Sequence, residues 1–260
     1  MDTPFTIVVE GNIGAGKSTL IKSQTNCLTR TELIHEDLED WINLGGHNLL
    51  ELYYQNPKQY QYLFQNAVYQ SQIKNILSRK HPIKLMERSP YSSFYVFIHN
   101  HKGIMTDIEF QALKSTFKMI TEKPGIGFKP DLIVYVRETP EKCLERIKKR
   151  NRPEEKDITL EYLTRIHDLH EEWLIREEKP VPARVIIFDW NKGFFNITLN
   201  LFRICKAIVD NSPVQLPARD QQAAAVLTEV PPHSNGEEGG DRQDDGDESR
   251  RPRVEGGVRL

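Results

Sequence analysis

A glycine-rich segment near the start of the chain constrains its fold more than any other feature. The segment GNIGAGKS, from Gly11 to Ser18, matches the pattern G-x-x-x-x-G-K-[ST] at every position. It follows an apolar run and precedes a helix-compatible stretch, Thr19–Ser23, which is the context that the motif requires. Glycines let backbone N–H groups approach phosphate oxygens, and the helix dipole adds positive potential. The motif predicts binding of a nucleoside triphosphate by Gly11, Asn12, Ile13, Gly14, Ala15, Gly16, Lys17, Ser18 and Thr19.

Short apolar runs predict the strands of a sheet. They are continuous and rich in β-branched residues, as expected for strands that are covered on both faces. The predicted strands are Phe5–Val9, Glu32–His35, Ile83–Met86, Leu132–Val136 and Arg184–Phe188. Helix-compatible stretches lie between them, the longest being Lys58–Leu77, Asp107–Thr121 and Thr159–Ile175. Alternating strands and helices predict an α/β fold with a parallel sheet and right-handed crossovers.

Composition excludes several other classes of protein. The chain has 260 residues, 28% of them charged and 38% hydrophobic, and no apolar run is long enough to span a membrane. The first residues show no targeting pattern, so we expect a cytosolic protein, with the nucleus as an alternative. Cys27, Cys143 and Cys205 have no C-x-x-C spacing, which argues against a disulfide scaffold and a cysteine zinc site.

The last fifty residues differ from the rest of the chain. Residues 211–260 contain no Phe, Tyr or Trp, and they carry 10 acidic and 6 basic side chains. Such a segment cannot bury enough apolar surface to offset its ordering entropy. We therefore expect a folded domain over residues 1–210 and a disordered tail, in which Arg250, Arg251 and Arg253 form a short cluster. A concentrated basic face is missing from the sequence, so we expect no nucleic-acid binding.

The phosphate-binding motif also occurs in regulatory GTPases. These proteins need a guanine-reading N-K-x-D sequence, and the nearest match, residues 191–194, has Phe194 where the aspartate should stand. A D-x-x-G sequence after a suitable strand is missing as well. The remaining charged residues instead favour a kinase that acts on a small molecule.

Acidic residues follow two of the predicted strands. Glu36 comes after the second strand, and Glu87 with Arg88 comes after the third. The carboxyl ends of parallel strands border the crevice where ligands bind. There Glu87 and Ser18 are candidate ligands of Mg²⁺, while Lys17 and Arg88 can stabilise phosphoryl charge. Glu36 is the candidate base for a substrate hydroxyl, because such a base must lie within hydrogen-bond reach of its proton.

A strongly basic segment follows the fourth predicted strand. The sequence RIKKRNRPEEK, residues 146–156, contains six basic residues, among them Arg146, Arg150 and Arg152. Arginines on a lid can neutralise a phosphoryl group in transfer, and lid closure excludes water. A solvated helix face is the alternative, because charges four residues apart also stabilise an exposed helix.

Together these motifs resemble the deoxynucleoside kinase family over about residues 5–190. The resemblance is carried by EGNIGAGKST, GHNLLELYY, MERSPYSS, RIKKRNRPEEK and YLTRIHDLHEEWL. The lid and the helix after it are most similar to the mitochondrial thymidine kinase and insect multisubstrate branches. The resemblance implies a P-loop kinase fold, a five-stranded parallel sheet wrapped by helices, an arginine-rich lid and usually a homodimer. It also implies transfer of phosphate from ATP, with Mg²⁺, to the 5′-hydroxyl of a deoxynucleoside.

The resemblance also implies roles for individual residues. Glu36 matches the general base and Arg88 the arginine beside it, while Tyr54 and Glu155 match the residues that hold the sugar 3′-hydroxyl. Gln65 matches the glutamine that pairs with the base edge. The aromatic residues that line the nucleoside pocket are matched by Trp41 and Phe97, and the lid arginines by Arg146, Arg150 and Arg152.

The pocket residues bear on the choice of nucleoside. Gln65, Val68 and Gln72 share one face of a predicted helix, and a carboxamide such as Gln65 can pair with either thymine or cytosine. Relatives that prefer deoxycytidine and purines have an arginine–aspartate pair where this chain has Gln72 and Ser93. Pyrimidine-preferring relatives have methionine and alanine there, and Val68 matches their type. We therefore expect thymidine and deoxycytidine to be favoured, with some purine activity.

One departure from the family's sequence pattern and two alternative functions stay open. The family usually has Glu-Pro-Val where this chain has Glu36-Asp37-Leu38, and loss of the proline loosens the turn that aims Glu36. A nucleoside monophosphate kinase, such as a thymidylate kinase, shares the loop and the lid, but its anionic acceptor needs no carboxylate base. A non-catalytic nucleotide-binding protein that acts through its tail is the alternative from another class.

Overall fold

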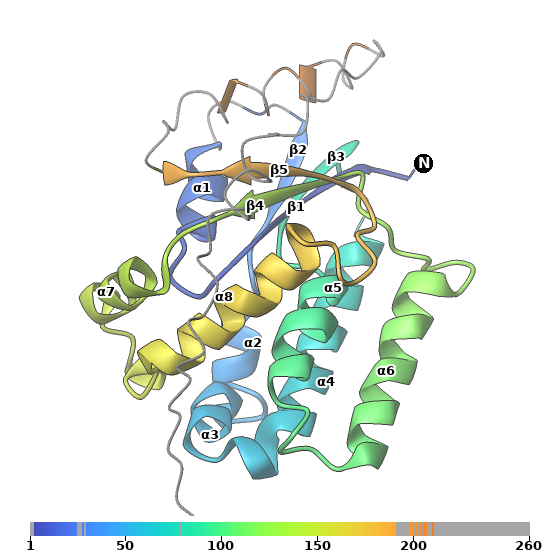
Figure 1. Ribbon diagram of the computed structural model, residues 1–260. Helices are drawn as coiled ribbons and strands as arrows, with labels where there is room; N and C mark the ends of the chain where they lie inside the picture. Colours follow the sequence, from blue (N-terminus) through green and yellow to red (C-terminus); the bar gives the residue numbers. More distant parts are fainter. Residues whose placement is uncertain are drawn as a thin grey trace, which may run out of the picture.

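The computed structural model describes residues 3–24, 28, 30–78, 80–190, 198, 199, 201, 203, 205, 206 and 210. Within them, five parallel strands form one sheet in the order β2-β3-β1-β4-β5 (Figure 1). The predicted α/β fold with a five-stranded parallel sheet is confirmed. The strands are β1 Phe5–Gly11, β2 Thr31–Ile34, β3 Ile83–Glu87, β4 Leu132–Val136 and β5 Arg184–Phe188.

Three strands differ at their ends from the predicted ones. β1 continues to Gly11, because Glu10 pairs with Tyr135 of β4 and Gly11 pairs with Val136. A charged residue and a glycine interrupt the apolar pattern, so the pattern alone ends this strand too early. β3 also gains one residue, and β2 lies one residue earlier than predicted, which leaves His35 in the connection that follows it.

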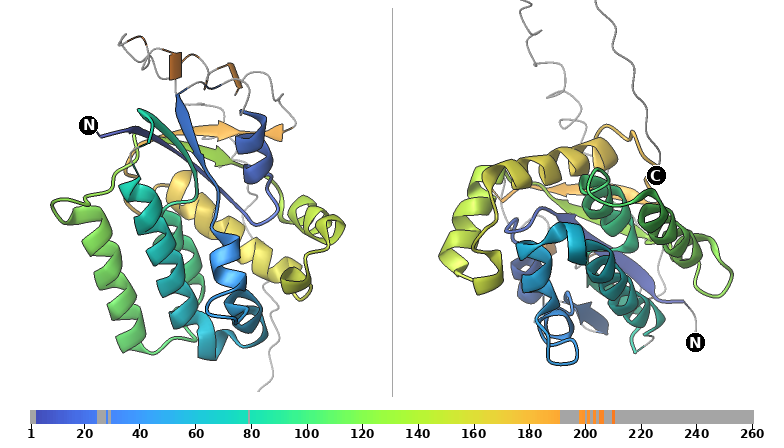
Figure 2. Two further views of the ribbon diagram at one scale, coloured as in Figure 1. Left: turned by 180° about the vertical axis from the view of Figure 1, so that it is seen from behind. Right: turned by 90° about the horizontal axis from the view of Figure 1, so that it is seen from below.

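Helices cover both faces of the sheet. α1 lies on one face, and α4, α6 and α8 lie on the other, as Figures 1 and 2 show from three sides. The long predicted helices are confirmed within two residues at each end, whereas the short elements α2, α3, α5 and the π-helical η1 have no counterpart in the prediction. The elements are α1 Lys17–Ser23, α2 Leu38–Ile42, α3 Leu49–Gln55, α4 Pro57–Leu77, α5 Pro90–Ser92, η1 Ser93–Ile98, α6 Asp107–Glu122, α7 Pro140–Arg150, η2 Pro153–Glu155 and α8 Leu160–Leu174.

The sheet divides the core into two main clusters. Ile7 and Val9 of β1 belong to the cluster under α1, and Val8 belongs to the cluster under α4, α6 and α8. Successive side chains of a strand point to opposite faces. Glu10 therefore shares the face of Val8, and it is completely buried there. A carboxyl group thus lies at the end of an otherwise apolar strand.

α4 is held at both of its ends by polar contacts. The Asn56 side chain accepts a hydrogen bond from the amide of Gln59, which caps the first turn. At the other end, the ammonium of buried Lys84 donates to the carbonyls of Asn75 and Ile76, both at 2.7 Å. Because Lys84 belongs to β3, this contact fixes the end of α4 against the sheet.

Several sequence-based expectations concern residues outside the described part. They are the disordered tail at 211–260, Cys27 and the segment 191–194. Cys143 and Cys205 are buried free thiols. Among the described residues, no helix is long and apolar enough to cross a membrane.

Candidate functional site

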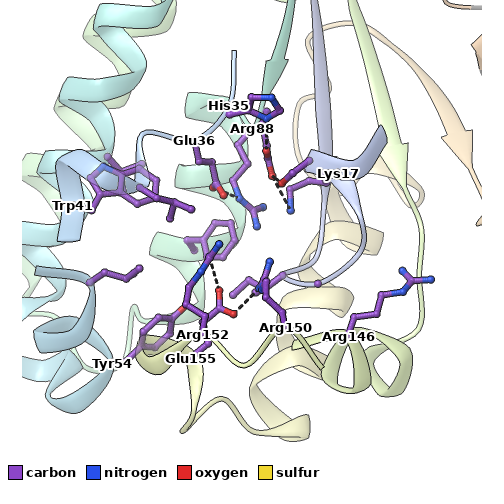
Figure 3. A pocket seen from close by; sticks show the side chains of 18 of the residues that line it. Lys17, His35, Glu36, Trp41, Tyr54, Arg88, Arg146, Arg150, Arg152 and Glu155 are labelled. Carbon is purple, nitrogen blue, oxygen red and sulfur yellow. Dashed lines mark hydrogen bonds and ion pairs between the residues drawn. The ribbon is translucent and has the colours of Figure 1, made fainter. Parts of the chain in front are cut away.

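A cavity of about 590 Å³ opens at the carboxyl ends of β1, β2 and β3 (Figure 3). One wall is the glycine-rich loop, a second wall is formed by α2, α3 and α4, and the basic segment after β4 closes a third side. The predicted site residues that line it are Ile13, Gly14, Gly16, Lys17, Ser18, Thr19, Glu36, Trp41, Tyr54, Gln65, Val68, Glu87, Arg88, Ser93, Phe97, Arg146, Arg150, Arg152 and Glu155. Sequence motifs from six separate segments thus meet in one place.

Four predicted residues lie behind the cavity wall. Gly11, Asn12 and Ala15 contribute backbone carbonyls that accept hydrogen bonds from Arg88, Lys17 and Arg146, respectively. The fourth is Gln72, whose amide donates to the hydroxyl of Ser93 at 2.9 Å. Each of these four residues therefore acts on the site through a hydrogen bond with a side chain that lines the cavity.

Other residues line the cavity although sequence reasoning did not select them. Tyr53 stacks on Phe64 with a centroid distance of 4.5 Å, and Trp41 meets the same ring edge-on at 5.5 Å. Tyr162 of α8 and His35 also line it. His35 stands directly before Glu36, at the carboxyl end of a predicted strand, and this place was the signal available for it. Tyr162 lies far away in the sequence and carried no such signal.

The phosphate loop takes the conformation that its glycines allow. Gly14 and Gly16 have φ values of 78° and 99°, in the region that favours glycine. A Cβ atom at Gly16 would lie 2.8 Å from the ring of Trp190, whose indole N–H donates to the Ala15 carbonyl at 2.7 Å. The tryptophan after β5 therefore packs directly on the loop.

Lys17 is buried within this loop. Its ammonium donates to the Asn12 carbonyl at 3.0 Å and lies 3.8 Å from Glu87 Oε1. Burial, followed by repulsion from Arg88, lowers the pKa of Lys17 below its usual value. An anionic phosphate would offset this cost, so the loop is prepared for a negatively charged ligand.

A hydroxyl and a carboxylate stand together beside Lys17. Ser18 Oγ donates to Glu87 Oε1 at 3.0 Å, and His35 Nδ1 lies 3.5 Å from Glu87 Oε2. Burial acts to raise the pKa of Glu87, but the contact with His35 and the charges of Lys17 and Arg88 lower it to about 2. In the described part of the chain, no three His, Cys, Asp or Glu side chains cluster as metal ligands. One carboxylate and one hydroxyl suit Mg²⁺, which keeps waters and takes its other ligands from substrate phosphates.

The centre of the cavity holds a short ion pair. Arg88 Nε donates to Glu36 Oε1 at 2.6 Å, and Arg88 Nη1 donates to the Gly11 carbonyl at 2.9 Å. The guanidinium also lies over the Phe97 ring, 4.5 Å from its centroid. Burial acts to lower the pKa of Arg88, but Glu36, Glu10 and Glu87 outweigh it and raise the pKa above its usual value. Arg88 is therefore a fixed cation that aims the Glu36 carboxylate.

The three predicted lid arginines fall into two groups. Arg150 and Arg152 donate to the two oxygens of Glu155, at 2.6 and 3.0 Å, and this carboxylate is almost fully buried. Arg146 instead donates to Glu138 at 2.6 Å and to the Ala15 carbonyl at 3.0 Å. Figure 3 shows the first pair gathered around Glu155 and Arg146 apart from them.

A phosphate loop, a carboxylate held by an arginine and a basic segment after β4 define a P-loop phosphotransferase. A model of the deoxynucleoside kinase family matches residues 7–212, and the chain belongs to this family. The mitochondrial thymidine kinase 2 of Homo sapiens is 38% identical over 187 residues, which cover 70% of this chain and 69% of the relative. Deoxycytidine kinase 2 of Gallus gallus is 32% identical over 223 residues, covering 73% and 83%. The mitochondrial deoxyguanosine kinase of Xenopus laevis is 31% identical over 196 residues, covering 66% and 74%.

The contact between Gly16 and Trp190 yields a test of the loop. Gly16→Ala should destabilise the protein more than Gly46→Ala, by about 1–3 kcal/mol, because an overpacked contact adds to the backbone strain. Gly46 is the matched control, since its φ of 89° is similar and a Cβ there meets nothing within 4 Å. Urea unfolding of both variants measures the difference. Equal losses would contradict tight packing of Trp190 on the loop.

Proposed function

We propose that the protein is a deoxynucleoside 5′-kinase that uses ATP and Mg²⁺ and favours thymidine and deoxycytidine in nucleoside salvage. The Glu36–Arg88 pair carries this proposal, because it lies between the phosphate loop and the aromatic half of one cavity. A carboxylate held there is within reach of a hydroxyl that faces a bound triphosphate. Membership of the family makes the chain a kinase with ATP as the phosphoryl donor. The cavity supports a deoxynucleoside as the acceptor.

The geometry supports a direct in-line transfer. Glu36 accepts the proton of the 5′-hydroxyl, whose oxygen attacks the γ-phosphorus while the bond to the leaving ADP oxygen breaks. Lys17 and Arg88 stabilise the charge that spreads over the transferring group, and Arg150 and Arg152 close the site from the lid side. Mg²⁺, when held by Ser18 and Glu87, supplies further neutralisation of the phosphate charge.

The aromatic half of the cavity supports a pyrimidine as the base of the nucleoside. Gln65 offers an acceptor and a donor side by side, and Val68 limits the space next to it. Gln72 and Ser93 bind each other, which leaves the Gln72 carbonyl oxygen buried and unpaired in the described structure. This neutral pair lacks the charges that the purine-accepting relatives carry. Ser93 lines the cavity and keeps a polar group there, so some purine activity stays within the proposal.

Assembly and location extend the proposal. α4 and α6 are neighbours, and both expose large apolar side chains, including Leu63 and Leu77 on α4 and Ile108 and Met119 on α6. Exposed apolar side chains on neighbouring helices suit an interface, so we propose a homodimer through these helices. The proposal also keeps a kinase domain at 1–210 and a cytosolic location, with the nucleus as the alternative.

An acceptor panel tests the proposed function. With Mg·ATP, thymidine and deoxycytidine should be phosphorylated fastest, deoxyadenosine and deoxyguanosine more slowly, and thymidine monophosphate not at all. Phosphoryl transfer is followed by the formation of ADP and of the nucleotide product. Activity on thymidine monophosphate alone would favour the monophosphate kinase alternative. Nucleotide binding without transfer to any acceptor would favour the non-catalytic one.

The role of Glu36 has its own prediction. Glu36→Gln keeps an oxygen that accepts from Arg88 but removes the base, so kcat should fall by roughly 10²–10⁴. The dissociation constant of thymidine should change little, as measured by calorimetry. Glu39→Gln, on the exposed side of α2, is the control and should keep the wild-type kcat. A Glu36→Gln variant with unchanged kcat would remove the base assignment.

Glu155 should report on the 3′-hydroxyl. Glu155→Gln should reduce kcat/KM for thymidine more than for 3′-deoxythymidine, because only thymidine loses a hydrogen bond to the sugar. A smaller loss should remain for the deoxy analogue, since Arg150 and Arg152 lose their shared anion. Glu154→Gln is the neighbouring control, because Glu154 binds Asn48 instead. Equal losses for the two acceptors would contradict contact with the 3′-hydroxyl.

A further inference from the structure

A buried carboxyl group behind the cavity has no part in the mechanism so far. Glu10, at the end of β1, is completely buried and does not line the cavity. Its Oε1 accepts a hydrogen bond from the hydroxyl of Ser89 at 2.6 Å. Its Oε2 is buried without a hydrogen-bond partner in the described structure. Leaving a carboxyl oxygen unpaired is costly, so a compensating gain should be sought nearby.

That gain lies in the turn that Glu10 contacts. Arg88 has a φ of 63°, a left-handed conformation that a residue with a side chain adopts only under constraint from its surroundings. Its backbone N–H donates to the Val9 carbonyl at 3.0 Å, and its guanidinium donates to the Gly11 carbonyl at 2.9 Å. Three successive residues of β1 thus hold the turn, and Glu10 is the one that does so through its side chain.

We propose that Glu10 is a positioning residue for phosphoryl transfer: by binding Ser89 it holds the left-handed Arg88, whose guanidinium then aims Glu36. This inference rests on the proposed kinase function, because Arg88 acts there through Glu36. Glu10 itself touches neither substrate nor reacting atoms. Its contribution should therefore appear in kcat, with a small effect on nucleoside binding.

The burial of Glu10 lowers the stability of the folded protein at high pH, and this effect can be measured. Burial raises the pKa of Glu10 to about 7, although hydrogen bonds from Ser89 and Ser92 and the charges of Arg88 and Lys17 act to lower it. Tyr135 lies beside it on β4, and His170 of α8 stacks on Tyr135, with a pKa that burial holds well below its usual value. The pKa of Glu10 is higher in the folded protein than in the unfolded one. Its favourable contribution to the stability of the fold is therefore fully present below about pH 4.5. It is lost as the pH rises through about 7.

Glutamine at position 10 separates the two effects. Glu10→Gln is nearly isosteric and uncharged, so it avoids the cost of burying an anion at high pH. We expect its melting temperature to exceed that of the wild type at pH 8.5, and this advantage to shrink or vanish at pH 5.5. With thymidine and Mg·ATP at pH 8.5, Glu10→Gln should keep most of the wild-type kcat, because its amide oxygen still accepts from Ser89. Glu10→Met keeps the volume but has no oxygen to accept that bond, so its kcat should fall by roughly tenfold or more, because a misplaced Arg88 misaims Glu36. KM for thymidine should stay within about twofold, since Glu10 lies outside the cavity.

Ser89→Ala provides a second route to the same contact. It should lower kcat as much as Glu10→Met does, and the double variant of Glu10→Met with Ser89→Ala should be little slower than either single one, because both remove one interaction. Glu109→Gln is the control: Glu109 caps α6 on the surface, so this variant should keep the wild-type kcat.

The outcomes distinguish the positioning role of Glu10 from the proposed kinase function. A fast and more stable Glu10→Gln enzyme beside a slow Glu10→Met enzyme supports the positioning role, since kcat then follows the hydrogen bond to Ser89 and not the charge at position 10. Wild-type kcat in Glu10→Met, or additive losses of Glu10→Met and Ser89→Ala, would overturn it while the kinase assignment stands. A parallel fall of kcat and melting temperature in Glu10→Gln would also overturn it. A wild-type protein that phosphorylates no nucleoside would instead refute the proposed function.

Discussion

The buried guanidinium of Arg88 is the interaction on which the candidate site depends. It binds Glu36, the Gly11 carbonyl and the face of Phe97, so it joins the end of β1, the connection after β2 and η1. A buried cation is tolerated only where anions and hydrogen bonds compensate for lost water. Glu36, Glu87 and Glu10 supply the anions. The carboxylates of the site therefore support the fold, because they compensate for the buried charge of Arg88.

The parts of the site that local sequence determines were predictable. The loop from Gly11 to Ser18 needs only its own glycines and the helix after it, and Glu87 follows a strand whose apolar pattern is plain. Parallel strands bring their carboxyl ends to one edge, so Glu36 and Glu87 had to lie near each other. For these residues, spacing along the chain and the topology of the sheet are sufficient.

The remaining parts depend on packing between distant segments. Tyr162 lines the cavity because α8 crosses beneath the sheet. Trp190, which follows β5 in the chain, packs against Gly16. Glu10 was not foreseen because its charge marks the end of an apolar run, whereas pairing with β4 carries the strand beyond it. The predicted lid arginines also divide in a way that charge alone does not indicate, since Glu138 holds Arg146 apart from the other two.

The pairing of Arg150 and Arg152 with Glu155 links the lid to the acceptor side of the cavity. All three residues belong to one short segment, in which the carboxylate holds the two guanidiniums. The hydrogen bond between Asn48 and Glu154 ties this segment to α3, which also carries Tyr54. In the proposed kinase, an acceptor that contacts Tyr54 and Glu155 would order the arginines of this segment. The acceptor would then help to complete the site at which it reacts, which is how a lid can couple recognition to transfer.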